Sequence, residues 1–284
     1  MEVVSATKMR KSQEFALRAR PFAVASLEML RNIVRRISVF PPLLQSRPVV
    51  HALLLVVTSD KGLAGAFNAN VLKKADSIFD KNGGSAFYRM ITVGKKARDH
   101  FERKGVAVDK AFTGFGDYTE MAETIPIADR LIEGFSNASW DEAVAIYTNF
   151  RTTLQQEAVV KKILPATLES IENAVASILP EKGKFAYVAD FKKEHQYAYE
   201  YQFEPTPAEI LQSLVSQLIR MHVHHVILES NASEHSARMV AMKSASDNAK
   251  DLITSLTLTY NKVRQATITQ ELAEITGGRE ALEQ

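Results

Sequence analysis

The apolar residues of the first forty positions recur at steps of three and four, with charged residues between them. This spacing places the apolar side chains on one face of a helix. Pro21 is expected to kink or split that helix, because proline lacks an amide proton and clashes with the preceding turn. The pair Pro41 and Pro42 then ends it, so the pattern predicts a helical segment over residues 1–40. Its apolar face consists of Val3, Met9, Phe15, Phe22, Leu27, Leu30, Val34 and Ile37.

Between residues 49 and 203, extended apolar runs alternate with helical stretches, which predicts an α/β domain with a largely parallel sheet. Strands are predicted at residues 51–57, 88–93, 106–112, 143–148 and 163–171. Helices are predicted at residues 68–80, 95–103 and 120–135. Alternating aromatic residues near the end of the stretch 184–203 would fit a further strand.

The last segment, residues 206–278, predicts one long helix. Thr206 supplies a hydroxyl cap and Pro207 suits the first turn. Residues 208–276 contain neither proline nor glycine, and the pair Gly277 and Gly278 is expected to end the helix. The second half carries a heptad seam that calls for a partner helix, and the N-terminal segment is the candidate. The seam consists of Ala249, Leu252, Leu256, Thr259, Val263, Ala266, Gln270 and Ala273.

These three segments together predict a fold in which the N- and C-terminal helices form a long antiparallel coiled coil around an inserted α/β domain. The charge balance, 35 basic against 33 acidic residues, gives no reason to expect a nucleic acid partner. The N-terminal helix is nevertheless strongly basic, so it should either meet an acidic surface or present a solvated face of the coiled coil. The chain has no cysteine, and no apolar run is long enough to span a bilayer.

The stretch SDKGLAG, residues 59–65, follows the first predicted strand and has the outline of a phosphate-binding loop. A Walker A loop needs Gly-Lys followed by Ser or Thr, whereas Lys61 precedes Gly62 and Leu63 follows it. A dinucleotide fingerprint needs three spaced glycines, and only Gly62 and Gly65 are present. The pattern therefore favours a tight turn from strand to helix over a nucleotide site.

Three histidines, His222, His224 and His225, could suggest a metal site. No carboxylate pattern of the H-E-x-x-H type accompanies them, so packing or surface histidines at a helix junction are favoured. No nucleophile elbow or Ser-x-x-Lys motif is placed where it could act. The sequence predicts no catalytic residue, no cofactor and no metal.

Three stretches resemble the gamma subunit of F-type ATP synthases: MEVVSATKMRKSQ from Met1, TSDKGLAGAFNANV from Thr58, and the C-terminal stretch from Ser233 to Gly278. The last is the most specific, because it follows the C-terminal signature of the family. The signature positions are Ile268, Thr269, Glu271, Glu274 and Gly278. The resemblance covers essentially the whole chain in segment order.

The resemblance implies that the coiled coil is the rotor shaft inside a ring of three alpha and three beta subunits. The Rossmann-like domain would sit at the foot, beside the epsilon subunit and the membrane c-ring. The chain would be a non-catalytic subunit that transmits torque from the c-ring to the beta subunits in proton-driven ATP synthesis and regulates ATPase activity and ion flow. It would be peripheral to the cytoplasmic face of the cell membrane.

The resemblance also implies rotor–stator contacts. Arg264 and Gln265 match family positions near the shaft tip that contact the beta subunit, with Thr269 and Glu271 close behind. Basic residues of the N-terminal helix match the stretch that faces an acidic segment of the beta subunit, and Met1 matches a methionine at which the shaft meets it. These basic residues are Lys8, Arg10 and Lys11.

Two features depart from the family pattern. Arg279 stands where the family signature has alanine. The family also has about twenty further residues before the position of Met1, and the uncapped opening in mid-helix leads us to expect that the start was assigned to an internal methionine. Two other function classes stay open from the residues alone, namely a Rossmann-type nucleotide-binding protein and a coiled-coil scaffold.

Overall fold

The computed structural model describes residues 1–18, 20–34, 40–81, 83–116, 119–167, 169–172, 204 and 206–282. These residues belong to two compact units, Met1–Met239 and Val240–Gln284. The first unit contains a sheet, its covering helices and the first part of the longest helix, which is α7. The second unit contains the rest of α7. Within the described residues, none of the helices is long and apolar enough to cross a membrane.

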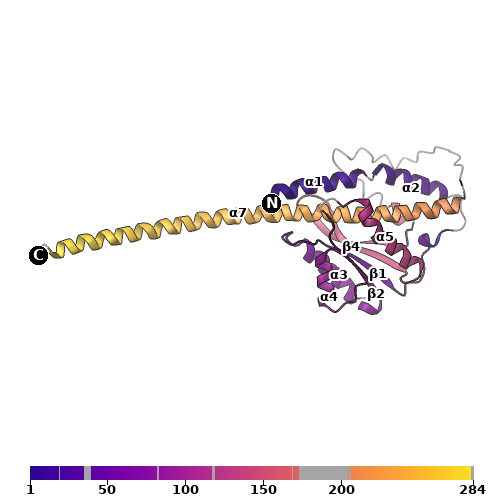
Figure 1. Ribbon diagram of the computed structural model, residues 1–284, viewed down its shortest axis with the longest axis horizontal. Helices are drawn as coiled ribbons and strands as arrows, with labels where there is room; N and C mark the ends of the chain where they lie inside the picture. The colour runs from indigo at the N-terminus through magenta and orange to yellow at the C-terminus, as the bar shows by residue number, and fades with distance from the viewer. Residues whose placement is uncertain are drawn as a thin grey trace. The chain divides into compact units, whose positions relative to one another are not determined.

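Two helices begin the first unit, α1 (Glu2–Arg18) and α2 (Arg20–Val34). Pro21 is the second residue of α2. The predicted kink or break at Pro21 depends on residue 19, which lies outside the described residues. Figure 1 shows α1 and α2 running antiparallel to the first part of α7. Leu27, Leu30 and Ile33 of α2 are buried in one cluster with residues of α7.

The sheet has five strands in the order β3-β2-β1-β4-β5. Strands β1, β2, β3 and β4 are joined by parallel pairings, and β5 pairs antiparallel with β4. The prediction of a largely parallel sheet is thus confirmed. The strand bounds are β1 (Ala52–Val57), β2 (Tyr88–Val93), β3 (Lys110–Phe112), β4 (Glu142–Phe150) and β5 (Gln156–Leu164).

One predicted strand was misplaced and another was too long. The prediction of a strand at 163–171 was wrong, because β5 ends at Leu164 and residues 169–172 are helical. β5 lies at the edge of the sheet and carries polar residues at Gln156, Glu157, Lys161 and Lys162, so its first part lacks the apolar run that marks a buried strand. β3 covers only the end of the predicted stretch 106–112. The further strand proposed near the end of 184–203 lies outside the described residues.

Strand β1 connects two hydrophobic clusters, because its side chains alternate between the faces of the sheet. Leu53, Leu55 and Val57 point into the cluster that contains α5 and α7. The other β1 residues point into a second cluster with α3 and α4. The helix bounds are α3 (Phe67–Lys81), α4 (Lys95–Arg103) and α5 (Met121–Ser136), and short 3-10 turns occupy η1 (Pro42–Leu44) and η2 (Gly84–Ala86).

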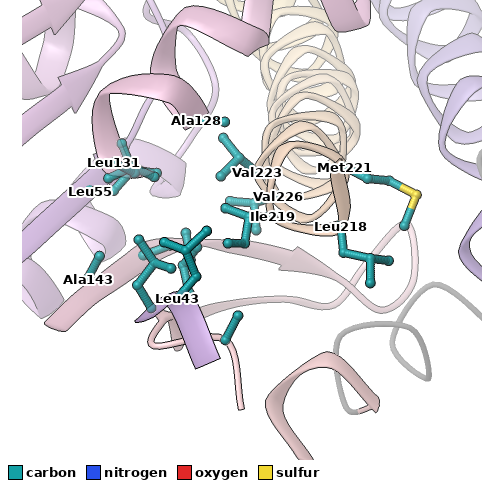
Figure 2. Packing of buried hydrophobic residues seen from close by; sticks show 14 of the residues in the cluster. Leu43, Leu55, Ala128, Leu131, Ala143, Leu218, Ile219, Met221, Val223 and Val226 are labelled. Carbon is teal, nitrogen blue, oxygen red and sulfur yellow. The ribbon is translucent and has the colours of Figure 1, made fainter. Parts of the chain in front are cut away.

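Helix α7 (Pro207–Leu282) begins as the sequence predicts. The amide of Glu209 donates to Oγ1 of Thr206 at 3.4 Å, which caps the first turn. In the first unit, α7 has buried residues on more than one side. Figure 2 shows Ile219, Val223 and Val226 on the side of α5, and Leu218 and Met221 on another side of the helix.

The end of α7 differs from the prediction, because the helix continues through Gly277 and Gly278 to Leu282. Glycine is a weak helix former but keeps its amide proton, so the intrahelical hydrogen bonds can continue through it. The heptad seam lies in the second unit, and its apolar members are exposed there, with Leu252 at 60% and Val263 at 59%. The N-terminal helices α1 and α2 instead pair with the first part of α7.

Polar groups are buried where α7 crosses β4 and β5. The carboxyl group of Glu229 is close to the phenol of Tyr147 and to the charge of Lys161, and burial raises the pKa of Glu229 although Lys161 opposes the shift. Ring atom Nε2 of His222 is buried without a hydrogen-bond partner among the described residues. Burial lowers the pKa of His222 to about 3, helped by the charge of Lys161. His222 is therefore neutral in the folded chain near pH 7.

Replacing Gly278 by alanine tests the continuity of α7. Because the helix passes through this position and no atom lies within 4 Å of the added Cβ, alanine should stabilise the last turns. The expected gain is about 1 kcal/mol of local stability. Amide hydrogen exchange of residues 276–282 measures it. Faster exchange in the variant would show that a left-handed glycine ends the helix, as the sequence suggested.

His222→Leu tests the neutral buried histidine. The folded-state pKa lies below the ordinary value of about 6.5, so the unfolded chain gains a proton as the pH falls below that value and the folded chain does not. Stability should therefore fall as the pH drops from about 6.5 toward 3, by about 1.4 kcal/mol per pH unit from this group. Urea unfolding at several pH values should give a shallower fall for the variant. Equal slopes would contradict the assignment.

Candidate functional site

The basic residues predicted to contact a partner lie on α1 in the first unit. Met1 is 80% exposed, and Arg10 and Lys11 are exposed as well, whereas Lys8 is half-buried. Lys8 and Lys11 are about one helical turn apart, so they share one side of α1. Ser5 and Ser12, small residues seven positions apart, are the buried positions among residues 2–15 of this helix. The structure thus brings the predicted N-terminal set together on one helix, with three of its four members exposed.

The C-terminal set, Arg264, Gln265, Thr269 and Glu271, lies on α7 in the second unit, and all four side chains are exposed. The hydroxyl of Thr269 donates to the carbonyl of Gln265 at 2.8 Å, so it is satisfied within the helix. Arg264 and Glu271 are seven residues apart and therefore lie on the same side, about two turns from each other. This part of α7 offers a charged side and a neutral polar side to a partner.

The loop after β1 is held by its own side chains. Asp60 accepts hydrogen bonds from the amide of Lys95 at 2.8 Å and from the amide of Gly114 at 2.7 Å. Oγ1 of Thr58 accepts a bond from the amide of Ala97 at 2.9 Å. In nucleotide-binding folds, amides at such a helix N-terminus hold a phosphate. Here the carboxylate of Asp60 occupies the N-terminus of α4, the helix after β2, and ties the loop after β1 to its neighbours, which supports the interpretation of the loop as a structural turn.

The edge at the carboxyl ends of the strands is occupied by α7. In doubly wound sheets, ligands bind outside this edge, at the point where the strand order reverses. The reversal falls between β1 and β4 in the present sheet. A small cavity of about 120 Å³ lies at the same edge, beside the ends of β1 and β2, and α7 forms one of its walls. The α7 residues that line it are Ile227, Asn231, Glu234, His235 and Arg238.

The contacts of α7 at this edge are polar. Asn231 Nδ2 donates to Oγ1 of Thr119 at 3.0 Å, and Arg238 donates to the carbonyl of Gly62 at 3.3 Å. Arg238 also pairs with Glu234. The hydroxyl of Ser233 donates to the carbonyl of Thr148 at 3.1 Å.

Ser236 completes these contacts at the turn between β4 and β5. Its hydroxyl donates to the carbonyl of Thr153 at 2.8 Å and accepts from Nε2 of Gln156 at 3.1 Å. Sequence reasoning placed residues 233–238 in a stretch of family resemblance but assigned no contact to any residue of 231–238. The available signal was the spacing of Ser230, Ser233 and Ser236, which recur every third residue within a helix although serine is a poor helix former.

The three histidines do not converge. Nδ1 of His224 lies 3.1 Å from Oγ1 of Thr124, and burial lowers the pKa of His224. Nε2 of His225 lies 3.8 Å from a carboxylate oxygen of Glu229. All three are inside α7 rather than at a helix junction. Among the described residues, no group of three histidine, cysteine or carboxylate side chains is arranged to hold a metal ion.

Comparison with solved structures shows the same fold in ATP synthase stalks. The chain is similar to one in the central stalk and c-ring structure of the Tetrahymena thermophila mitochondrial ATP synthase, with a TM-score of 0.62 and 22% identity. That match covers 87% of this chain and 97% of the other. A chain of the Euglena gracilis mitochondrial ATP synthase gives a TM-score of 0.58 at 18% identity, over 99% of this chain and 94% of the other. The predicted fold class is thereby confirmed.

Sequence comparison gives the family. The family model described as ATP synthase matches residues 1–282. The ATP synthase gamma chain of Roseiflexus castenholzii is 37% identical over 286 residues, which cover 99% of this chain and 91% of the relative. That of Chlorobium phaeobacteroides is 34% identical over 289 residues, covering 100% of this chain and 92% of the relative. The chain therefore belongs to the ATP synthase gamma chain family, the non-catalytic subunits of the central stalk.

Proposed function

We propose that this gamma chain transmits torque between a membrane c-ring and the catalytic beta subunits, with α7 as the shaft. The observation that carries the proposal is the change along this one helix. Residues 211–239 of α7 are largely buried by the sheet and the N-terminal helices, whereas residues 243–276 are almost entirely exposed. The first part is fixed by packing within its own domain, and the second part is accessible to other subunits.

The mechanism follows from the asymmetry of such a shaft. A helix presents different side chains at each angle, so its rotation changes the contacts made with each surrounding subunit. Each catalytic site then shifts between conformations with different affinities for ADP, phosphate and ATP, because the contacts stabilise the conformations unequally. No residue of this chain makes or breaks a bond in this scheme.

The contact residues of the proposal are the two sets on α1 and α7. The exposed Arg264, Gln265, Thr269 and Glu271 would touch the beta subunits through charge and hydrogen bonds. The basic set Lys8, Arg10 and Lys11, together with Met1, would face an acidic segment of the beta subunit. Polar contacts of this kind can be exchanged during rotation at less cost than one large apolar interface.

The proposed partners are three alpha and three beta subunits, the epsilon subunit and the c-ring. The chain would be attached to the cytoplasmic face of the cell membrane through this complex. Through its contacts it would also regulate ATPase activity and ion flow. Purification of the tagged chain from its host tests the assembly, with co-purified alpha, beta and epsilon subunits expected. Their absence would overturn the proposal.

A nucleotide-binding function is the alternative that the α/β domain suggests. It is disfavoured by the position of Asp60, whose carboxylate would repel a phosphate from the amides of Lys95 and Gly114. Micromolar nucleotide binding by the isolated chain would revive it. A coiled-coil scaffold would explain α7 but gives no role to the sheet that encloses its first part.

Replacement of Arg264 and Gln265 by alanine tests the contacts near the shaft tip. Both side chains are exposed and alanine favours the helix, so α7 should stay folded. Coupled ATP synthesis in inverted membrane vesicles should fall by about 5- to 100-fold, the range of an ordinary coupling free energy.

Lys250→Ala is the matched control, because it removes an exposed charge from the same helix outside the predicted set. It should leave ATP synthesis within about twofold of the wild type, as expected of an exposed surface charge. Full activity of the Arg264 and Gln265 variant would show that these side chains do not serve the beta subunits.

A further inference from the structure

The part of α7 from Asn231 to Arg238 lies in the crevice where doubly wound sheets bind their ligands. Its neighbours there are the loop after β1, the segment before α5, and the end of β4 with the turn to β5. The helix thus occupies the place of a ligand in its own domain. Its polar side chains make the hydrogen bonds that a ligand would make.

These hydrogen bonds extend from two opposite sides of α7. One turn of an α-helix takes about 3.6 residues, so each residue turns the side chain by about 100°. Asn231 and Arg238 are seven residues apart and point in nearly the same direction, toward Thr119 and Gly62. Ser233 and Ser236 are about 60° from each other and about half a turn from the first pair.

Ser233 and Ser236 contact the other half of the crevice, which is formed by the end of β4 and the turn to β5. Both serine side chains are fully buried, and their hydroxyls bond to the carbonyls of Thr148 and Thr153. Gln156 donates to Ser236 from the far side of the same turn. The side chains are small, so the helix comes close to the strand ends, and a rotation in either direction would break bonds on both sides.

Apolar packing alone would not fix this angle. Hydrophobic contacts depend on the area buried and have little directionality of their own, so the apolar interface resists rotation only through the fit of its side chains. Hydrogen bonds require both distance and direction, and a buried polar group that loses its partner is destabilising. The polar segment therefore determines the angle, while the apolar segment before it supplies most of the adhesion.

We propose that the hydrogen bonds of Asn231, Ser233, Ser236 and Arg238 with both sides of the crevice form a two-sided grip that fixes the rotational angle of α7 on the sheet domain. The inference rests on the proposed rotor function, in which torque must pass between the domain and the shaft without slippage. The four side chains are positioning residues, and they touch no nucleotide.

The double variant Ser233→Ala and Ser236→Ala tests the grip. Alanine keeps the helix and nearly the same volume, so it removes the hydroxyls with little disturbance of the packing. The gamma chain has no cysteine, so a single Lys74→Cys on the exposed side of α3 gives one attachment point for a bead. The angle of the bead is recorded in a surface-held complex with cysteine-free alpha and beta subunits, during the pauses between ATP-driven steps.

The angular variance during the pauses should rise about twofold or more in the double variant, as loss of directional bonds between neighbouring groups predicts. Ser216→Ala is the matched control, because that hydroxyl bonds only within α7, to the carbonyl of Gln212. It should leave the variance unchanged. Gln156→Leu, which removes a partner from the sheet side, should broaden the distribution in the same direction as the double variant.

The rate of ATP hydrolysis shows whether a variant affects catalysis as well as the angle of α7. This rate should be the same in all variants. A variance equal to that of the wild type in both the double variant and Gln156→Leu would overturn the inference. If the wild-type complex itself hydrolyses ATP without turning the bead, the proposed function fails, and that outcome is distinct from failure of the grip.

Discussion

Burial of the first part of α7 against the sheet is the contact on which the rest of the structure depends. The sheet face formed by alternate β1 residues packs in one hydrophobic cluster with α5 and this helix. The antiparallel helix α2 covers another side of α7, with Leu30 and Ile33 fully buried. Without α7, both surfaces would be exposed to water, at a cost of about 25 cal/mol for each Å² of apolar area. The domain and the helix therefore stabilise each other.

The same constraint explains the change of composition along α7. Where the helix is enclosed, it carries apolar residues such as Val215 and Val223, followed by small polar residues at the crevice. Beyond the enclosed part, Arg264 and Glu271 lie among residues exposed on every side. One helix thus combines a part packed within its own domain with a part whose side chains are exposed, which is what the proposed shaft requires. The Asp60 carboxylate belongs to the same arrangement, because it ties the loop after β1 to the start of α4 and to Gly114 beside the crevice that the helix occupies.

Much of this fold could be predicted from the sequence where local signals agree. The strand 88–93 and the helix 95–103 were predicted to the residue, since an apolar run meets Gly94 and then a charged amphipathic stretch. Other features depend on tertiary contacts. β5 is a polar edge strand that is defined by its pairing with β4, and the helix continues through Gly277 because nothing in the structure requires a turn there.

The site was predicted less completely than the fold. The proposed contact residues on α1 and α7 came from a resemblance, not from any pattern of charge or spacing. The segment 231–238 reads as an ordinary polar stretch of helix, and its partners are about 80 to 180 residues distant in the chain. No local pattern in the sequence reveals such pairings. They become visible only when the strand order places the carboxyl ends of β1 and β4 beside one another.

The central claim is that α7 turns as a shaft fixed to the sheet domain. Its most direct test is to record the direction of a bead attached to that domain while a surface-held complex with alpha and beta subunits hydrolyses ATP. The account predicts rotation in one direction, with three pauses per turn because three catalytic sites act in sequence. Steady hydrolysis with a bead that only fluctuates about one angle would contradict it.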